Sequence, residues 1–447
     1  MRKFLLLLAC LVFLAACGGN VSEAEVYEPE VYEPEIYEPE VYAPETRDFS
    51  GDAGFLVEMV EAIHPIFLMP GKLPENYEQV RAEFLNYTQM PITRNAFTLA
   101  AMRFMAVLPD SHSGIFLARA ELQFIAEPFK ARDSRLFLLN EPYMEVISIG
   151  GIDVREIFDI VDRHHIVEND IQRMLNYGEW AGRAEFLEMA GVELFYSGDA
   201  LSVELGLLYN GAEISRTAEF GRRRLILPNY DFGINHKIID DVFLIDLRVA
   251  IDDPYVEAVA EAVYAAIESG IYKFILDLRG NEGGDIFPWI RLANAMGATS
   301  ATPGRILRIS EHLFRNLAGE DAEPLNLDEF GELRVIFEAD PYAAENPNGI
   351  FVAVLTDNYT FSAATQIATM IVDGNHGIIV GEPSRQSPSF FAEMMPVYLP
   401  ESSLSVFIST SWWGRPNQGI IGDTLYPDIW AESADALNVA LEYLAMR

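Results

Sequence analysis

The sequence has little cysteine, little histidine and little positive charge. Its two cysteines, Cys10 and Cys17, are too few to form a zinc finger, an iron–sulfur cluster or a disulfide framework. Only seven histidines are present, so a histidine that moves protons must be one of them. Lysine and arginine total 31 against 68 acidic residues, which gives a formal net charge of −37. Such a surface repels phosphate backbones, and nucleic-acid binding is therefore not expected.

Hydrophobic residues are abundant, at 50% of the 447 residues, whereas 22% are charged. This composition supports a large buried core and excludes wholesale disorder. The length predicts two or three domains at about 150 residues each.

Residues 1–16 have the pattern of an export signal. Arg2 and Lys3 precede an apolar run, residues 4–16, that is too short to cross about 30 Å of hydrocarbon as a helix. The sequence LAAC at 14–17 resembles the lipobox of bacterial lipoproteins. That resemblance implies cleavage before Cys17, lipidation of its sulfur, and anchoring on the extracytoplasmic side of a bacterial cell membrane. An ordinary secretory signal with an incidental cysteine is the alternative.

Residues 17–48 are expected to form a lipid-anchored spacer. They contain four consecutive Tyr- and Glu-rich pentads, at 26–45, in which a proline recurs at every fifth residue. Proline forbids a helix and the glutamates repel one another, so the segment would hold the body of the protein away from a membrane. A tyrosine-rich adhesive or partner-binding strip is the alternative.

The rest of the chain divides into three regions by pattern. Apolar residues recur at helical spacing in 49–115, and 116–234 is mixed, with two strands expected at about 201–208 and 213–220. From 235 to 447, buried strands alternate with helices. Such an α/β pattern predicts βαβ units and an active site at the carboxyl ends of the strands.

Two loops directly follow strands of this last region. The first has the sequence DLRGNEGG, and its Gly283 and Gly284 allow backbone N–H groups to approach a ligand closely. The second places Ser362 at the start of a helix, where unpaired N–H groups favour both a nucleophile and an oxyanion. Taken alone, a plain strand-to-helix turn and a helix N-cap are the simpler interpretations.

A third polar segment, LPDSHSG at 108–114, contains His112 between two apolar stretches. A serine nucleophile needs a base with a pKa near neutrality, and histidine supplies one. Taken alone, this segment would be interpreted as a surface turn.

Together these motifs resemble those of the S41 peptidases, the tail-specific and C-terminal-processing proteases. The resemblance implies a crotonase-like (ClpP/crotonase-type) peptidase core at 235–447. It also implies an N-terminal helical segment at 49–115 and a degenerate PDZ-like segment within 116–234. It rests on the DLRxNxGG signature at 277–284, the nucleophile motif at 362–364, the GEP turn at 381–383, the YPDI motif at 426–429 and the PDZ-like stretch around 149–151.

Two branches of this family use different bases. The C-terminal-processing branch has a lysine after the GE turn, but no lysine follows Lys273 here. The tricorn-core and retinoid-binding-protein-like branch has an upstream DxH motif, which Asp110-Ser111-His112 matches. This resemblance assigns the base to His112 and a role in orienting it to Ser111. The late glutamate of that branch has no clear counterpart, and Asp423 is the nearest acidic candidate.

The resemblance implies a membrane-tethered, extracytoplasmic serine endopeptidase that acts on peptide or protein substrates. Ser362 would attack the scissile carbonyl and His112 would accept its proton. The N–H of Ala363, with that of Gly283 or Gly284, would form the oxyanion hole. Neither a metal nor an organic cofactor is implied. The PDZ-like segment would bind a peptide terminus as an added strand.

Two other functions remain open at this point. The unplaced acid and the missing lysine favour a non-catalytic S41-like lipoprotein that binds peptides or apolar ligands. Trp412, Trp413 and the many tyrosines could instead stack on sugars in a glycan-binding surface protein. The pattern indicates neither the substrate nor the oligomeric state.

Overall fold

The computed structural model describes residues 45–116, 123–221, 234–250, 254–318 and 330–447. Residues 45–447 belong to one compact unit. The predicted signal, most of the spacer, and Cys17 lie outside the described residues. Within the described ranges, no helix is both long enough and apolar enough to span a membrane.

The N-terminal region is helical, as its apolar spacing predicts. Phe49 stacks on Phe97 at a centroid distance of 4.8 Å, and Phe84 stacks on Phe104 at 5.0 Å. The same core includes side chains from two strands near the C-terminus, among them Ile408. The region 49–115 therefore has no core of its own. Its elements are β1 (Thr46–Arg47), α1 (Ser50–Ile63), a 3-10 helix (Pro65–Leu68), α2 (Tyr77–Tyr87), β2 (Ile92–Thr93) and α3 (Arg94–Met105).

The mixed region forms an antiparallel sheet with three helices. Its strand order is β4-β11-β10-β7-β6-β5, with β8 paired to β7 and β9 paired to β10. β10 and β11 occupy the positions of the two strands that the sequence predicts. The strands are β4 (Phe124–Ile125), β5 (Phe129–Arg132), β6 (Arg135–Leu138), β7 (Glu145–Ile149), β8 (Ile152–Asp153), β9 (Phe195–Ser197), β10 (Ala200–Tyr209) and β11 (Ala212–Gly221). The helices are α4 (Val154–His164), α5 (Asp170–Trp180) and α6 (Ala184–Met189).

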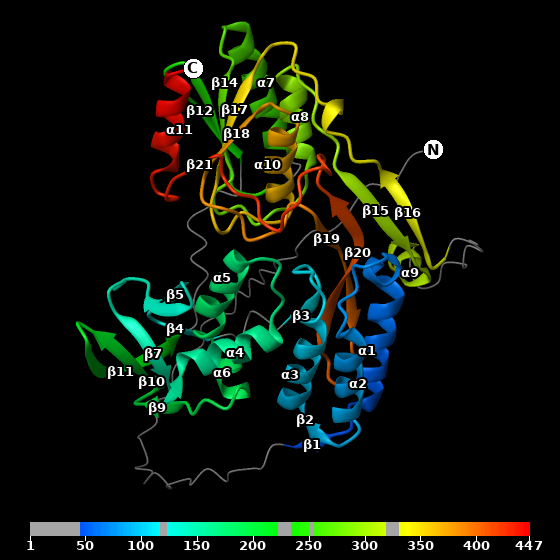
Figure 1. Ribbon diagram of the computed structural model, residues 1–447, viewed down its shortest axis with the longest axis vertical. Coiled ribbons are helices and arrows are strands. Elements are labelled where there is room, and N and C mark those ends of the chain that lie inside the picture. Colours follow the sequence, from blue (N-terminus) through cyan, green and yellow to red (C-terminus); the bar gives the residue numbers. More distant parts are fainter. Residues whose placement is uncertain (1–44, 117–122, 222–233, 251–253, 319–329) are drawn as a thin grey trace, which may run out of the picture. The chain divides into compact units, whose positions relative to one another are not determined.

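The C-terminal region contains a six-stranded sheet of order β12-β13-β14-β17-β18-β21, parallel from β13 onward. Helices α7, α8 and α10 cover one face, and α11 covers the other (Figure 1). The strands are β12 (Ile234–Ile239), β13 (Val242–Leu247), β14 (Lys273–Asp277), β17 (Phe351–Thr356), β18 (Gly377–Gly381) and β21 (Ile429–Trp430). The helices are α7 (Pro254–Glu268), α8 (Phe287–Ala295), α10 (Ala363–Asp373) and α11 (Ala436–Ala445).

A second sheet in the C-terminal region connects it to the N-terminal helices. Its order is β16-β15-β20-β19, and the short strand β3, which follows the His112 segment, pairs with β20. This pairing joins positions almost 300 residues apart, for example Gly114 and Phe407. Its elements are β3 (Gly114–Phe116), β15 (Gly304–Ile309), α9 (Glu311–Ala318), β16 (Glu332–Phe337), a 3-10 helix (Pro341–Ala343), β19 (Phe390–Tyr398) and β20 (Ser405–Gly414).

The fold is thus mixed α/β. The crotonase-like core and the PDZ-like segment stay predictions.

Replacing Phe97 by alanine should destabilise the whole fold. The side chain is fully buried between the helices and contacts two other phenylalanines, so the change leaves a cavity. We expect the free energy of unfolding, measured with urea, to fall by about 3–5 kcal/mol. The exposed Tyr342 provides a control, because Tyr342→Ala should change that free energy by less than about 0.5 kcal/mol. Equal effects of the two substitutions would contradict the shared core.

Candidate active site

Ser362 lies at the carboxyl edge of the parallel sheet, in the turn between β17 and α10. Its backbone has φ 52° and ψ −127°, in the region that favours glycine. For a serine this conformation costs roughly 1–3 kcal/mol, and such strain is concentrated at functional sites. The Ser362 side chain makes no capping hydrogen bond to α10. The N-cap interpretation therefore does not account for this serine.

The hydroxyl of Ser362 instead faces His112. The distance from its Oγ to Nε2 of His112 is 2.9 Å, across 250 residues of sequence. The pairing of β3 with β20 delivers the histidine to this edge, because the His112 turn directly precedes β3. A serine hydroxyl and an imidazole are thus within hydrogen-bonding distance, as a nucleophile and its base would be.

The imidazole of His112 is buried between two aromatic rings. Its centroid lies 4.8 Å from that of Phe361 and 5.6 Å from that of Phe390, and both pairs are stacked. Burial lowers the pKa of His112 below 6.5. The charge of Asp110 and a hydrogen bond with the backbone of Phe391 oppose this shift, while the charge of Arg385 adds to it. The ring is therefore neutral at pH 7 and can accept a proton.

Asp110 holds the turn that carries His112. Its Oδ1 accepts the backbone N–H of His112 at 2.9 Å, and its Oδ2 accepts the hydroxyl of Ser113 and Nε2 of His64. Nδ1 of His64 accepts the N–H of Ile66, so the proton of that ring is on Nε2. These hydrogen bonds outweigh burial and lower the pKa of Asp110 to about 2.

Glu168, between α4 and α5, is the acid that contacts Ser111. Its Oε1 accepts both the N–H of Ser111, at 3.0 Å, and the hydroxyl of that residue. Its Oε2 accepts the N–H of Ser387 at 3.2 Å. Burial raises the pKa of Glu168 to about 7, although the bonds from Ser111 and Ser387 work against this shift.

Asp423, the acid suggested by the sequence, has other contacts. Its carboxylate accepts the hydroxyl of Thr424, and its backbone carbonyl accepts the side-chain amide of Asn169. Among the hydrogen bonds of the described residues, none joins Asp423 to His112 or Ser111. The suggestion that Asp423 orients the base thus has no support in the geometry, whereas Glu168, from the mixed region, reaches Ser111.

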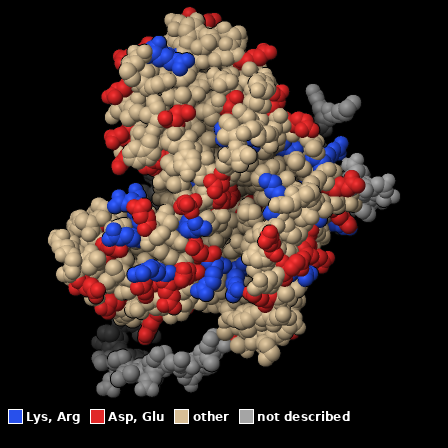
Figure 2. Space-filling model, viewed as in Figure 1, with Lys and Arg blue, Asp and Glu red and all other residues tan. Residues whose placement is uncertain are grey.

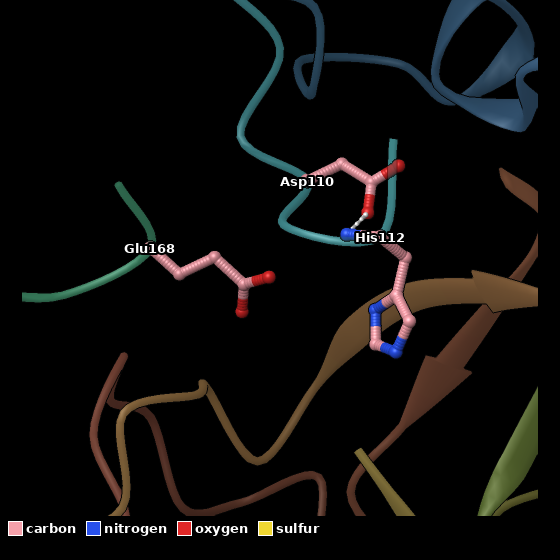
Figure 3. A group of neighbouring side chains, drawn as sticks. All are labelled: Asp110, His112 and Glu168. Carbon is pink, nitrogen blue, oxygen red and sulfur yellow. Dashed lines mark hydrogen bonds between the residues drawn. The ribbon is translucent and has the colours of Figure 1, made fainter. Parts of the chain in front are cut away.

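Asp110, His112 and Glu168 also form a compact group, with potential ligand atoms within 4.8 Å of one another. Figure 3 shows that the backbone N–H of His112, and not its ring, faces the carboxylate of Asp110. All four carboxylate oxygens already accept hydrogen bonds from protein groups. The group therefore fits a hydrogen-bond network better than a cation site.

The glycine loop after β14 lies against Ser362. A Cβ on Gly283 would come within 2.5 Å of the Ser362 Cβ and 3.1 Å of the Ala363 nitrogen. The N–H of Gly283 donates to Oδ1 of Asn281 at 2.8 Å, so it is already used. In the part of the chain that the structure describes, the N–H groups of Gly284 and Ala363 have no protein acceptor. Of the three predicted donors, these two fit an oxyanion hole best.

Gln386 links Ser362 and His112, and no sequence motif singles it out. Its buried side chain accepts the N–H of Ser362 through Oε1 at 2.5 Å. Its Nε2 lies 3.3 Å from Nδ1 of His112. It stands in the segment after the GEP turn, where the sequence lacks a lysine.

Comparison with known proteins supports this interpretation. Residues 251–429 match the family model for Peptidase family S41. Residues 251–429 of this chain therefore carry the sequence pattern of peptidase family S41. The chain is therefore a serine-type peptidase. No curated protein matches the sequence of this S41 peptidase.

Two solved structures, both of CPAF, are similar in fold to this S41 peptidase. Mature CPAF has a TM-score of 0.59 and 14% identity, over 89% of this chain and 95% of that chain. Mature CPAF in complex with lactacystin has a TM-score of 0.58 and 14% identity, over 89% of this chain and 97% of that chain. At this identity the similarity concerns the fold.

Glu168 should make the stability of this S41 peptidase depend on pH. Its pKa of about 7 in the fold lies above the usual 4.5, so folding favours the protonated form. That contribution is fully present below pH 4.5 and is lost as the pH rises through about 7. Relative to Glu168→Gln, the wild type should lose about 2 kcal/mol of unfolding free energy between pH 5 and pH 8. Urea unfolding at both pH values measures this change.

The exposed Glu58, on α1, provides the control for this measurement. Glu58→Gln should follow the wild type at both pH values. A difference between Glu168→Gln and the wild type that is the same at pH 5 and pH 8 would show that Glu168 has no raised pKa.

Proposed function

We propose that this protein is a membrane-tethered, extracytoplasmic serine peptidase with Ser362 as nucleophile and His112 as base. The observation that carries the proposal is the 2.9 Å distance between Ser362 Oγ and His112 Nε2. The backbone strain at Ser362 and the match to the family model support it.

The reaction follows from the positions of these groups. Oγ of Ser362 attacks the scissile carbonyl carbon as its proton passes to Nε2 of His112. The N–H groups of Ala363 and Gly284 bind the oxyanion, and the imidazolium then gives its proton to the leaving amine. Water attacks the resulting acyl-enzyme, again with His112 as base, and restores the serine. Glu168 holds Ser111 and, through it, the His112 turn.

The two alternative functions have less support. The non-catalytic alternative depends partly on the lack of an acid near Ser111. Glu168 contacts Ser111, so this argument loses weight. The tryptophans that could stack on sugars are engaged within the protein. Lys72 lies 3.8 Å above the Trp412 ring, which also contacts Phe391, and Trp413 is buried.

The mixed region is proposed to bind a segment of the substrate, as its PDZ-like sequence suggested. A pocket of about 650 Å³ lies along β7, β10 and β11, and Glu193, Glu204 and Glu213 line it. These carboxylates would repel a C-terminal carboxylate, so an uncharged or basic segment fits the pocket better. Acidic side chains also spread over the face shown in Figure 2, with basic ones between them.

Labelling of Ser362 tests the peptidase proposal. A fluorophosphonate probe should label the wild type, and Ser362→Ala should abolish the label. His112→Ala should slow the labelling by about two to four orders of magnitude, because it removes the general base. Mass spectrometry locates the label, and the second-order rate constant measures the effect. A folded wild type that is not labelled and cleaves nothing in a broad peptide library would refute the proposal.

Membrane tethering is proposed from the sequence alone, because Cys17 lies outside the described residues. In a bacterial host, the full-length chain should partition with the membrane fraction and gain the mass of a lipid at Cys17. Cys17→Ser should move the protein to the soluble extracytoplasmic fraction without loss of labelling at Ser362. A variant that stays in the membrane fraction would exclude this anchor.

A further inference from the structure

The orientation of the Gln386 amide is fixed by its neighbours. A backbone N–H can only donate, so the amide atom that faces the N–H of Ser362 must be the oxygen. The amide nitrogen then faces Nδ1 of His112 at 3.3 Å. Gln386 is fully buried, so no solvent-exposed rotamer competes with this arrangement.

This orientation determines which nitrogen of His112 carries the proton. The amide NH₂ has only donors to offer, so Nδ1 of His112 must supply a lone pair. The proton of the neutral ring is then on Nε2, which faces Oγ of Ser362. A nitrogen that already carries a proton cannot accept the one from Ser362.

We propose that Gln386 is a positioning residue that holds His112 in its non-reactive tautomer in the resting enzyme. Only the fraction of molecules with the ring proton on Nδ1 can then acylate. This inference rests on the proposed function and adds to it a restraint on the rate. In a serine protease triad, aspartate to asparagine at the position facing Nδ1 produces the wrong tautomer and lowers kcat about 10⁴-fold.

The other groups around the ring do not replace such an acid. Phe361 and Phe390 cover its faces. Asp110 bonds to the backbone N–H of His112, and Glu168 bonds to Ser111 and Ser387. Among the described residues, no carboxylate hydrogen-bonds to Nδ1 of His112. The backbone of Phe391 also hydrogen-bonds to the ring and favours its protonated form.

Gln386→Glu should allow His112 to adopt the tautomer with its proton on Nδ1. One carboxylate oxygen would accept the N–H of Ser362 and the other would accept a proton on Nδ1 of His112. Arg385, which follows Ser384 in the same loop and already acts electrostatically on His112, would offset the new charge. The substitution should therefore convert the pair into a Ser–His–Glu triad.

Fluorophosphonate labelling measures the effect on the rate. The second-order rate constant of Gln386→Glu should exceed that of the wild type by at least about tenfold at pH 7. The acid limb of its pH profile should also move to higher pH, because a carboxylate at Nδ1 favours the imidazolium. Gln89→Glu adds the same charge at an exposed position and should leave both quantities unchanged. An unchanged rate and profile in Gln386→Glu would overturn the inference.

A direct readout of the tautomer covers the case in which Gln386→Glu does not fold. The ¹⁵N chemical shifts of ring-labelled wild type, assigned by loss of signal in His112→Gln, distinguish the protonated nitrogen from the unprotonated one. We expect the proton on Nε2 in the wild type and on Nδ1 in Gln386→Glu. A proton on Nδ1 in the resting wild type would overturn the inference and leave the proposed function intact. If the tautomers are as expected but Ser362 is never labelled in either protein, the proposed function fails instead.

Discussion

The buried carboxylate of Asp110 is the group on which the arrangement of the site depends. It accepts hydrogen bonds from the end of α1, through His64, and from the backbone N–H of His112. It also accepts the hydroxyl of Ser113, whose oxygen in turn accepts the N–H of Ser409 in β20. One side chain thus ties together a helix, the turn that carries the base, and the strand that brings this turn to Ser362. An uncompensated buried carboxylate would be costly, so these donors are required for the fold as well as for the site.

The candidate active site combines residues from three regions of the chain. His112 comes from the N-terminal region, Ser362 from the parallel sheet, and Glu168 from the mixed region. The neighbouring residue Asn169 donates to the carbonyl oxygens of Ser384 and Asp423. The α4–α5 loop therefore contacts both the His112 turn and the loop that carries Gln386. A movement of the mixed region would change the surroundings of the base directly.

The sequence predicted the parts of the site that lie in short motifs. Ser362, His112 and the glycine loop stand in contiguous patterns, and their distances in the structure fit the roles that the family resemblance implied. Glu168 and Gln386 were missed because each is a single polar residue, without a local pattern, that becomes informative only through a contact more than 50 residues away in sequence. His64 was missed in a similar way, because its contact with Asp110 lies 46 residues away in sequence. The alternation of strands and helices predicted the parallel sheet. It gave no sign that β19 and β20 would form a second sheet and share a core with the N-terminal helices.

The stacking of Phe361 and Phe390 on His112 has a kinetic consequence for its proposed role as base. A ring clamped on both faces cannot turn over about its Cβ–Cγ bond without opening the packing on each side. Each nitrogen therefore keeps the same neighbour throughout the catalytic cycle. A proton can move between the two nitrogens only by addition at one and departure from the other, with the doubly protonated ring as the intermediate. This exchange becomes slower as the solution becomes more alkaline. The packing on both faces therefore makes the rate at which the ring changes tautomer depend on the proton concentration.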